Sequence, residues 1–158
     1  MSERSAPRRQ SRRAALQVLY ALDVGPGGRG GEKASADDVF ESVASHFDLH
    51  GGAHAFAKEL ALGVEAHRDD VDAHIARCAR NWRLERMAAV DRNVLRLATF
   101  ELLYTDTPHT VVIDEAVELA REFGSEPSPA FVNGVLDAVA RERREGGAPA
   151  GRGAESEA

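Results

Sequence analysis

Residues 81–104, "NWRLERMAAVDRNVLRLATFELLY", decide the fold class of this chain. Apolar residues recur along this stretch at intervals of three and four, and they share one side of a helix: Met87, Val90, Val94, Leu97 and Ala98. This spacing is typical of a helix that buries one side in a core. Pro108 follows shortly afterwards and cannot continue the pattern. The stretch therefore predicts one long helix that ends before this proline.

The same periodicity extends in both directions from this stretch. Towards the N-terminus it predicts helices around residues 15–22 and 39–47, and a third that starts at Phe56 and continues to Cys78. Towards the C-terminus it predicts two more, with buried positions at Ile113, Ala116, Val117, Ala120 and Phe123, and at Val132, Val135, Leu136 and Val139. Residues 110–113, "TVVI", are the only β-like stretch and are too short to stand alone. The sequence predicts an all-α fold of six or seven helices.

Turn residues separate the last two of these helices. Gly124 is predicted to close the earlier one as a glycine just past its end. Ser128 followed by Pro129 is a favourable N-cap and first-turn pair for the later one. The glycine-rich stretch 25–31, "GPGGRGG", predicts a flexible loop after the first helix.

Composition places the chain among globular proteins of a reducing compartment. Its 158 residues suit one domain, with 43% hydrophobic and 29% charged residues. No apolar run approaches the roughly 20 residues of a membrane span, and no secretory signal precedes the first helix. The single Cys78 cannot form an internal disulfide. We expect a cytoplasmic protein without a membrane segment.

Motifs that would indicate an enzyme or a metal site are absent from the sequence. There is no phosphate-binding glycine loop, no HExxH and no paired-cysteine zinc spacing. His46, His50 and His54 stand four apart, but Gly51 and Gly52 interrupt the helix that would align them. Cys78 shares a face with Val71 and Ile75, which favours a buried structural thiol. We therefore expect no catalytic residue, no metal and no cofactor.

Positive charge gathers at the start of an otherwise acidic chain. Residues 1–13 hold five arginines and one glutamate, a net charge of +4. Because the whole chain has a net charge of −6, the remaining residues have a net charge of −10. On a helix, Arg8, Arg9, Arg12 and Arg13 fall within a sector of about 140°, beside the apolar stripe. Two interpretations remain open at this point: a surface that binds a polyanion, or a solvated terminus.

Two positions near apolar helices, Phe131 and Asp91, also have two interpretations each. Phe131, in "FVNGVLD" (131–137), is either a core residue or a stacking platform for a base. Gly134 is expected to allow close helix packing. Asp91 belongs either to a surface charge pair or to a docking contact.

Four stretches in order resemble the NusB family of transcription antitermination factors: "RRAALQVLYALD", "NWRLERMAAVDRNVLRLATFELLY", "VVIDEAVELAREFG" and "FVNGVLD". With their spacers they extend from about residue 8 to about residue 143. The resemblance implies two packed helical subdomains and no catalysis. It implies that the protein pairs with the ribosomal protein NusE, binds boxA RNA in nascent ribosomal transcripts, and supports RNA polymerase together with other Nus factors.

The resemblance also assigns residues to these roles. RNA contact is implied for Arg8, Arg9, Arg12, Arg13 and Phe131, with Gln10 at a position that is often basic. NusE contact is implied for Tyr20, Asp91, Ser125, Glu126 and Pro127. Two positions depart from the family pattern. Pro127 stands where relatives can carry an acidic residue, and His109 stands where an aromatic residue can occur.

The expected domain organisation follows from the same comparison. Residues 1–7 are predicted as a disordered basic end and 145–158 as a disordered tail, on either side of one domain, 8–144. Its two subdomains are expected at about 8–80 and 81–144.

A homodimer that masks the basic edge is a further expectation. The alternative function is a helical protein adaptor without specific RNA binding. An RNA methyltransferase with a fused domain of this kind is rejected, because the chain stops at residue 158 with no catalytic domain downstream.

Overall fold

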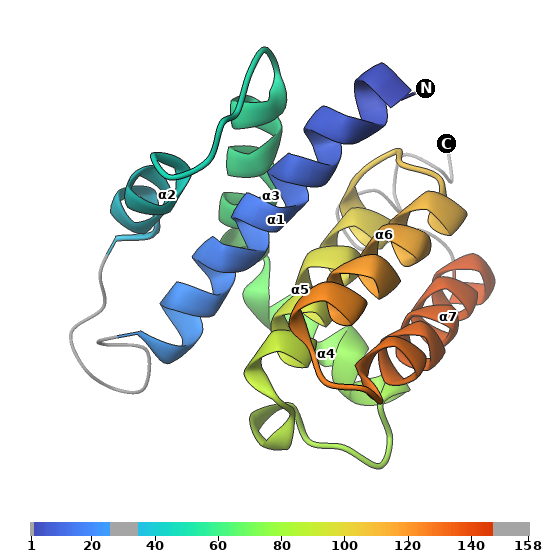
Figure 1. Ribbon diagram of the computed structural model, residues 1–158. Coiled ribbons are helices and arrows are strands. Elements are labelled where there is room, and N and C mark those ends of the chain that lie inside the picture. Colours follow the sequence, from blue (N-terminus) through green and yellow to red (C-terminus); the bar gives the residue numbers. More distant parts are fainter. Residues whose placement is uncertain (1, 26–34, 147–158) are drawn as a thin grey trace. The chain divides into compact units, whose positions relative to one another are not determined.

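The computed structural model describes residues 2–25 and 35–146, and within these ranges it is helical without a strand (Figure 1). Seven α-helices and one 3-10 helix follow in order: α1 (Ser2–Val24), α2 (Ala36–Ala44), α3 (Ala53–Ala66), α4 (Arg68–Cys78), η1 (Leu84–Arg86), α5 (Ala89–Tyr104), α6 (His109–Phe123) and α7 (Ser128–Gly146). The predicted all-α class is confirmed. No helix among the described residues is long and apolar enough to cross a membrane.

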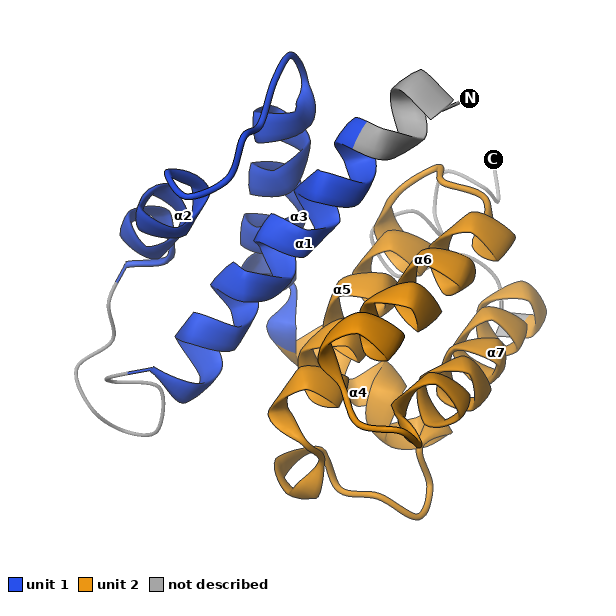
Figure 2. Ribbon diagram, viewed as in Figure 1, with its two compact units in different colours: residues 1–68 blue, residues 69–158 orange. Residues whose placement is uncertain are grey.

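The chain divides into two compact units, Met1–Arg68 and Asp69–Ala158 (Figure 2). The sequence placed this boundary near residue 80, because the apolar pattern runs without interruption from Phe56 to Cys78. The structure instead ends α3 before His67, whose N–H bonds the carbonyls of Gly63 and Val64 at 3.0 and 3.2 Å. No glycine or proline occurs at this break, so the sequence carries no signal for it.

The first unit is built from α1, α2 and α3, which pack against one another. Its core is apolar and includes Val18 and Leu19 of α1, Phe40 of α2, and Leu60 of α3. Burying a side chain of this size stabilises the fold by roughly 1.5–3 kcal/mol. The helical pattern of α1 already begins at Ser2, where the sequence predicted a disordered end over residues 1–7.

The second unit is centred on α5, which packs against both α6 and α7. Every residue of α5 from Arg92 to Leu103 is buried, including the charged Arg96 and Glu101. The one-sided apolar pattern predicted an amphipathic helix. It missed this burial because Arg92 and Arg96 of α5 make their hydrogen bonds inside the protein, as described below.

The buried face of α6 also differs from the prediction. The structure buries Val112, Ala116, Leu119 and Ala120, whereas the periodicity placed Ile113 and Val117 in the core. Both sets fit a helical repeat, because apolar residues occupy neighbouring stripes of this helix. In α7 the predicted set is buried as expected: Val132, Val135, Leu136 and Val139.

The end of α6 and the start of α7 differ from the prediction in their backbone conformation and hydrogen bonds. Gly124 has φ −97°, so it does not end α6 in a left-handed conformation. A Cβ there would lie 2.6 Å from Ser128 Oγ, so close approach explains this glycine. The Ser128 hydroxyl accepts a hydrogen bond from the Ser125 N–H at 3.0 Å, and therefore fixes the loop rather than capping α7. The loop 25–31, except Gly25, and the tail from residue 147 lie outside the described residues.

Candidate nucleic-acid interface

The basic residues of α1 lie against α3 in the first unit. The guanidinium carbon of Arg8 is 4.1 Å from the centre of the Phe56 ring, and that of Arg12 is 5.4 Å away. Residues four apart share one face of a helix, so both cations face one aromatic ring. A cation held over a ring is stabilised by the ring's negative face. Phe56 therefore orders the basic turn, and the sequence did not indicate its role.

A buried hydroxyl anchors the same turn. Ser11 is fully buried, and its Oγ lies 2.7 Å from the carbonyl oxygen of Ala53 and 3.1 Å from that of Pro7. The bond to Ala53 joins α1 to the first residue of α3. Hydrogen bonds that satisfy buried hydroxyls fix the relative positions of the elements they join. The basic turn is therefore docked on the first unit.

The four predicted arginines differ in exposure. Arg8 and Arg9 are exposed, Arg13 is half-buried, and Arg12 is only 4% exposed. Arg13 Nη1 donates to Gln10 Oε1 at 3.1 Å. Arg8, Arg9 and Arg13 are consequently the ones that a ligand can reach, whereas Arg12 packs as part of the support. We call these four residues the basic ridge.

The second unit carries an aromatic pair that includes Phe131. Its ring is half-buried and meets the ring of Trp82 edge to face, with the two centres 5.9 Å apart and the planes at 72°. Trp82 is 55% exposed and lies in the segment between α4 and η1. The sequence analysis singled out Phe131 but not Trp82. A lone tryptophan with arginines at positions 80, 83 and 86 is the signal that would have found it.

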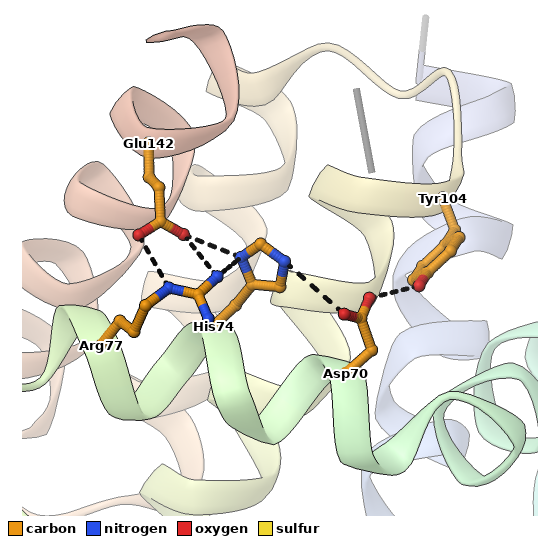
Figure 3. A network of polar contacts seen from close by, with 5 residues as sticks. All are labelled: Asp70, His74, Arg77, Tyr104 and Glu142. Atoms are coloured by element: carbon orange, nitrogen blue, oxygen red, sulfur yellow. Dashed lines mark hydrogen bonds and ion pairs between the residues drawn. The ribbon is translucent and has the colours of Figure 1, made fainter. Parts of the chain in front are cut away.

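A polar network holds the end of α4, from which the Trp82 segment starts (Figure 3). His74 Nδ1 lies 2.8 Å from Glu142 Oε1, and Arg77 contacts the same carboxylate through Nε at 3.2 Å and Nη2 at 3.1 Å. The contact with Arg77 lowers the pKa of Glu142 below its usual range, as does its contact with His74. The network joins α4 to α7.

The other side of the network joins α4 to α5. The Tyr104 hydroxyl donates to Asp70 Oδ2, and His74 Nε2 is 3.8 Å from the other oxygen of Asp70 (Figure 3). Burial and this hydrogen bond raise the pKa of Tyr104 to about 12. Asp70 thus receives contacts from both α4 and α5, although its side chain is 44% exposed.

Two buried arginines of α5 support the same region. Arg92 Nη1 donates to the carbonyls of Leu84 and Met87 at 3.0 and 2.9 Å, which ties the η1 segment to α5. Arg96 makes a bidentate pair with Asp72 of α4 through Nε at 2.8 Å and Nη2 at 3.1 Å. Charge-assisted pairs of this geometry are the stronger kind of hydrogen bond. Both ends of the Trp82 segment are thus fixed.

The residues assigned to a protein partner are distributed over both units. Tyr20 is 40% exposed on α1, and Val24, one turn further, is also exposed. Ser125, Glu126 and Pro127 are exposed in the α6–α7 loop. Each of these positions is accessible on the unit to which it belongs.

Asp91 is half-buried in the first turn of α5, and its Oδ1 is buried without a hydrogen-bond partner among the described residues. Leaving a buried polar atom unsatisfied costs roughly 1–3 kcal/mol. A donor from another molecule would remove that cost. His109, the second departure from the family pattern, is half-buried, and its pKa is lowered by burial and by Arg143 and Arg144.

The histidines and the cysteine have local structural environments. His50 pairs with Asp48 at 2.8 Å, and the ring of His54 meets that of Phe40 edge to face. In the part of the chain that the structure describes, no group of three His, Cys, Asp or Glu side chains is arranged to hold a metal ion. Burial raises the pKa of the Cys78 thiol, although the residue is half-buried rather than fully buried as the sequence predicted.

Comparison with known proteins identifies the family. The NusB family matches residues 9–141. A relative from Anaeromyxobacter dehalogenans, named transcription antitermination protein NusB, is 49% identical over 134 residues, covering 84% of this chain and 89% of the relative. One of the same name from Geotalea daltonii is 44% identical over 135 residues, covering 84% of this chain and 93% of the relative.

Solved structures agree with the sequence comparison. T. maritima NusB superposes with a TM-score of 0.75 at 36% identity, covering 85% of this chain and 91% of that one. A crystal structure of the antitermination factors NusB and NusE in complex with double-stranded RNA matches with a TM-score of 0.73 at 28% identity, covering 86% and 97%. The chain belongs to the NusB family of transcription antitermination factors, which is not a family of enzymes. The resemblance drawn from the four sequence stretches is confirmed.

Proposed function

We propose that this chain binds boxA RNA of nascent ribosomal transcripts together with NusE, and so supports processive transcription by RNA polymerase with other Nus factors. The observation that supports this proposal best is the similarity to a NusB that was crystallised with NusE and RNA. The complex would act on nascent transcripts and hence in the cytoplasm.

The basic ridge is the part of the first unit that would contact RNA phosphates. Arginine matches phosphate oxygens with two parallel hydrogen bonds, and phosphate contacts supply much of the affinity for nucleic acids. Arg8, Arg9 and Arg13 present accessible guanidinium groups, and Arg12 supports them against Phe56. In the second unit, Phe131 would contact RNA close to Trp82.

The NusE surface would include Tyr20, Asp91 and the loop residues Ser125, Glu126 and Pro127. The unpartnered Asp91 Oδ1 favours a donor from the partner at this point. Asp91→Asn keeps the shape and removes the charge, and Asp91→Arg reverses it. Both should weaken the NusE complex, the reversal more strongly, because interface charges act through complementarity. Unchanged co-purification with NusE, together with wild-type melting curves, would remove Asp91 from the surface.

The test of the whole proposal is equilibrium binding to a boxA RNA and to a scrambled RNA of the same length, each with and without NusE. We expect tighter binding to the boxA RNA and a further gain with NusE. Equal binding to both RNAs, with NusE still bound, would favour a protein adaptor instead.

Sedimentation of the protein without NusE, in the absence and in the presence of RNA, tests the homodimer that would mask the basic ridge. The dimer should dissociate when RNA binds.

A further inference from the structure

A second cationic and aromatic surface lies in the second unit, between α4 and α5. Arg80, Arg83 and Arg86 are exposed on either side of Trp82. Glu85, also exposed, is the one acidic residue in this segment, and it lies 3.9 Å from Arg83. The segment thus carries a net positive charge in a chain whose net charge is −6. We call Trp82 and these three arginines the Trp82 patch.

The indole of Trp82 is available for stacking. An edge-to-face contact with Phe131 covers at most one face of the indole, and more than half of the side-chain surface remains exposed. An exposed indole is unfavourable in water, because burial of its apolar surface lowers the free energy. A nucleic-acid base offers a flat partner of matching size, and stacking on an aromatic ring tolerates any base.

The backbone that carries the indole is held in place. The Trp82 N–H bonds the Ala79 carbonyl at 3.0 Å, at the end of α4. Arg92 fixes Leu84 and Met87 on the other side of Trp82. The Arg77–Glu142 contact joins α4 itself to α7 (Figure 3). A platform fixed at both ends loses little conformational entropy on binding, which favours affinity.

We propose that Trp82 stacks on an unpaired base of the bound RNA, and that Arg80, Arg83 and Arg86 contact the phosphates on either side of that base. This inference rests on the proposed function and extends it to a base-stacking subsite in the second unit. The surrounding arginines favour RNA over a protein contact, because their charge complements a phosphate backbone. A tryptophan that served only a protein partner would not need this positive charge.

The lone tryptophan provides a direct measurement. Trp82 is the only tryptophan of the chain, so its intrinsic fluorescence reports on this subsite alone. We expect quenching when the purified protein is titrated with a single-stranded boxA RNA, in step with the anisotropy of the labelled RNA. RNAs with one abasic site each, tested in turn, should restore the fluorescence at the position of the stacked base and leave it quenched at the others.

Variants separate stacking from charge. Trp82→Ala should weaken RNA binding roughly ten-fold, and Trp82→Phe less, since a phenyl ring still stacks on a base. Arg83→Ala should reduce the log-log salt slope by about 0.7, the value for one lost contact on a single strand. Arg144→Ala is the matched control. It removes an arginine that is also exposed and lies about 20 Å from Phe131 along α7, and it should leave the slope unchanged.

The outcomes distinguish this inference from the proposed function. Binding by anisotropy without any quenching, and with wild-type affinity for Trp82→Ala, would overturn the subsite and leave the proposed function intact. Loss of NusE co-purification by Trp82→Ala, with RNA affinity unchanged, would assign Trp82 to the protein partner and also overturn it. Absence of any RNA binding, with or without NusE, would refute the proposed function itself. If Trp82→Ala does not fold, the quenching of the unmodified protein still decides.

Discussion

Arg12 shows that a charged residue in a basic ridge can serve the fold. It is 4% exposed and lies over Phe56, while its neighbour Arg9 is exposed. We expect Arg12→Ala to lower the free energy of unfolding by about 1 kcal/mol, the value of a partly desolvated cation–π contact. Arg9→Ala should change it by less than about 0.5 kcal/mol. Urea unfolding followed by circular dichroism measures both. Equal effects for the two variants would contradict the packing role of Arg12.

Tyr104 offers a direct reading of the network around α4. The pKa of its hydroxyl is raised to about 12 by burial and by the hydrogen bond to Asp70. The chain has two tyrosines, so Tyr20→Phe leaves Tyr104 as the only phenol. Its absorbance near 295 nm should titrate with a midpoint of about 12. Asp70→Asn in the same background should lower that midpoint.

The sign of the associated stability change follows from the direction of the shift. The folded state holds the Tyr104 proton more tightly than the unfolded chain, whose tyrosine titrates near pH 10. The contribution to stability is therefore complete below about pH 10 and is lost as the pH rises towards 12. The pKa of Glu142 moves in the opposite direction. Its contribution is present above the unfolded value of about 4.3 and is lost as the pH falls below it.

At the scale of helices, two glycines have opposite surroundings: Gly124 follows the end of α6, and Gly134 lies within α7. A Cβ on Gly124 would lie 2.6 Å from Ser128 Oγ and 2.7 Å from the Ala120 carbonyl oxygen. Gly134, within α7, has nothing within 4 Å of that position, which contradicts the expectation of close helix packing there. The Ala120 carbonyl belongs to the backbone of α6 and cannot move away easily from a Cβ at position 124. Gly134, by contrast, is exposed, so a methyl group there would meet solvent.

We therefore expect opposite effects of alanine at these positions. Gly124→Ala should destabilise the protein by about 1–3 kcal/mol through steric overlap. Gly134→Ala should stabilise it by up to about 1 kcal/mol, because alanine is the better helix former and nothing obstructs its methyl group. Thermal unfolding of both variants tests this pair. A loss of stability for Gly134→Ala would mean that its position is more crowded than the structure indicates.

Helices were predictable from sequence, but their ends and contacts were only partly so. Apolar spacing located α1, α2, α5, α6 and α7, because periodicity is a local property. It could not locate the break at His67, where no glycine or proline occurs, nor choose between the apolar stripes of α6. The full burial of α5 depends on Arg92 and Arg96 meeting carbonyls and a carboxylate from distant segments. Such partners cannot be read from local sequence.

The candidate site was predictable to a similar degree. The arginine cluster and Phe131 were visible as a charge run and as an aromatic residue at a helix start. The sequence did not show which arginines of the basic ridge are accessible and which pack against the fold, because that depends on Phe56 in another helix. Trp82 was missed although the arginines around it were a signal in the sequence; only its exposure depends on how the segment between α4 and η1 is placed.

For the whole molecule, the distribution of charge provides a way to restrict RNA to defined surfaces. The net charge is +4 over residues 1–13 and −10 over the remainder. A negative body repels phosphates, so RNA is confined to the places where arginines gather. The basic ridge in the first unit and the Trp82 patch in the second are two such places.

The ridge should therefore dominate the salt dependence of RNA binding. We expect a triple variant, Arg8→Ala, Arg9→Ala and Arg13→Ala, to flatten the log-log salt slope by up to about 2, or about 0.7 for each lost contact on a single strand. Arg12 is kept, because it is only 4% exposed and its removal would also disturb the packing of α1. Lys58→Ala is the matched control in the same unit. This lysine lies 3.4 Å from Asp37 and 3.5 Å from Glu41, so its loss should not alter the slope. Titrations of boxA RNA with NusE at several salt concentrations measure these slopes. If the triple variant has the slope of the unmodified protein, the ridge is a solvated terminus and the phosphates are bound elsewhere.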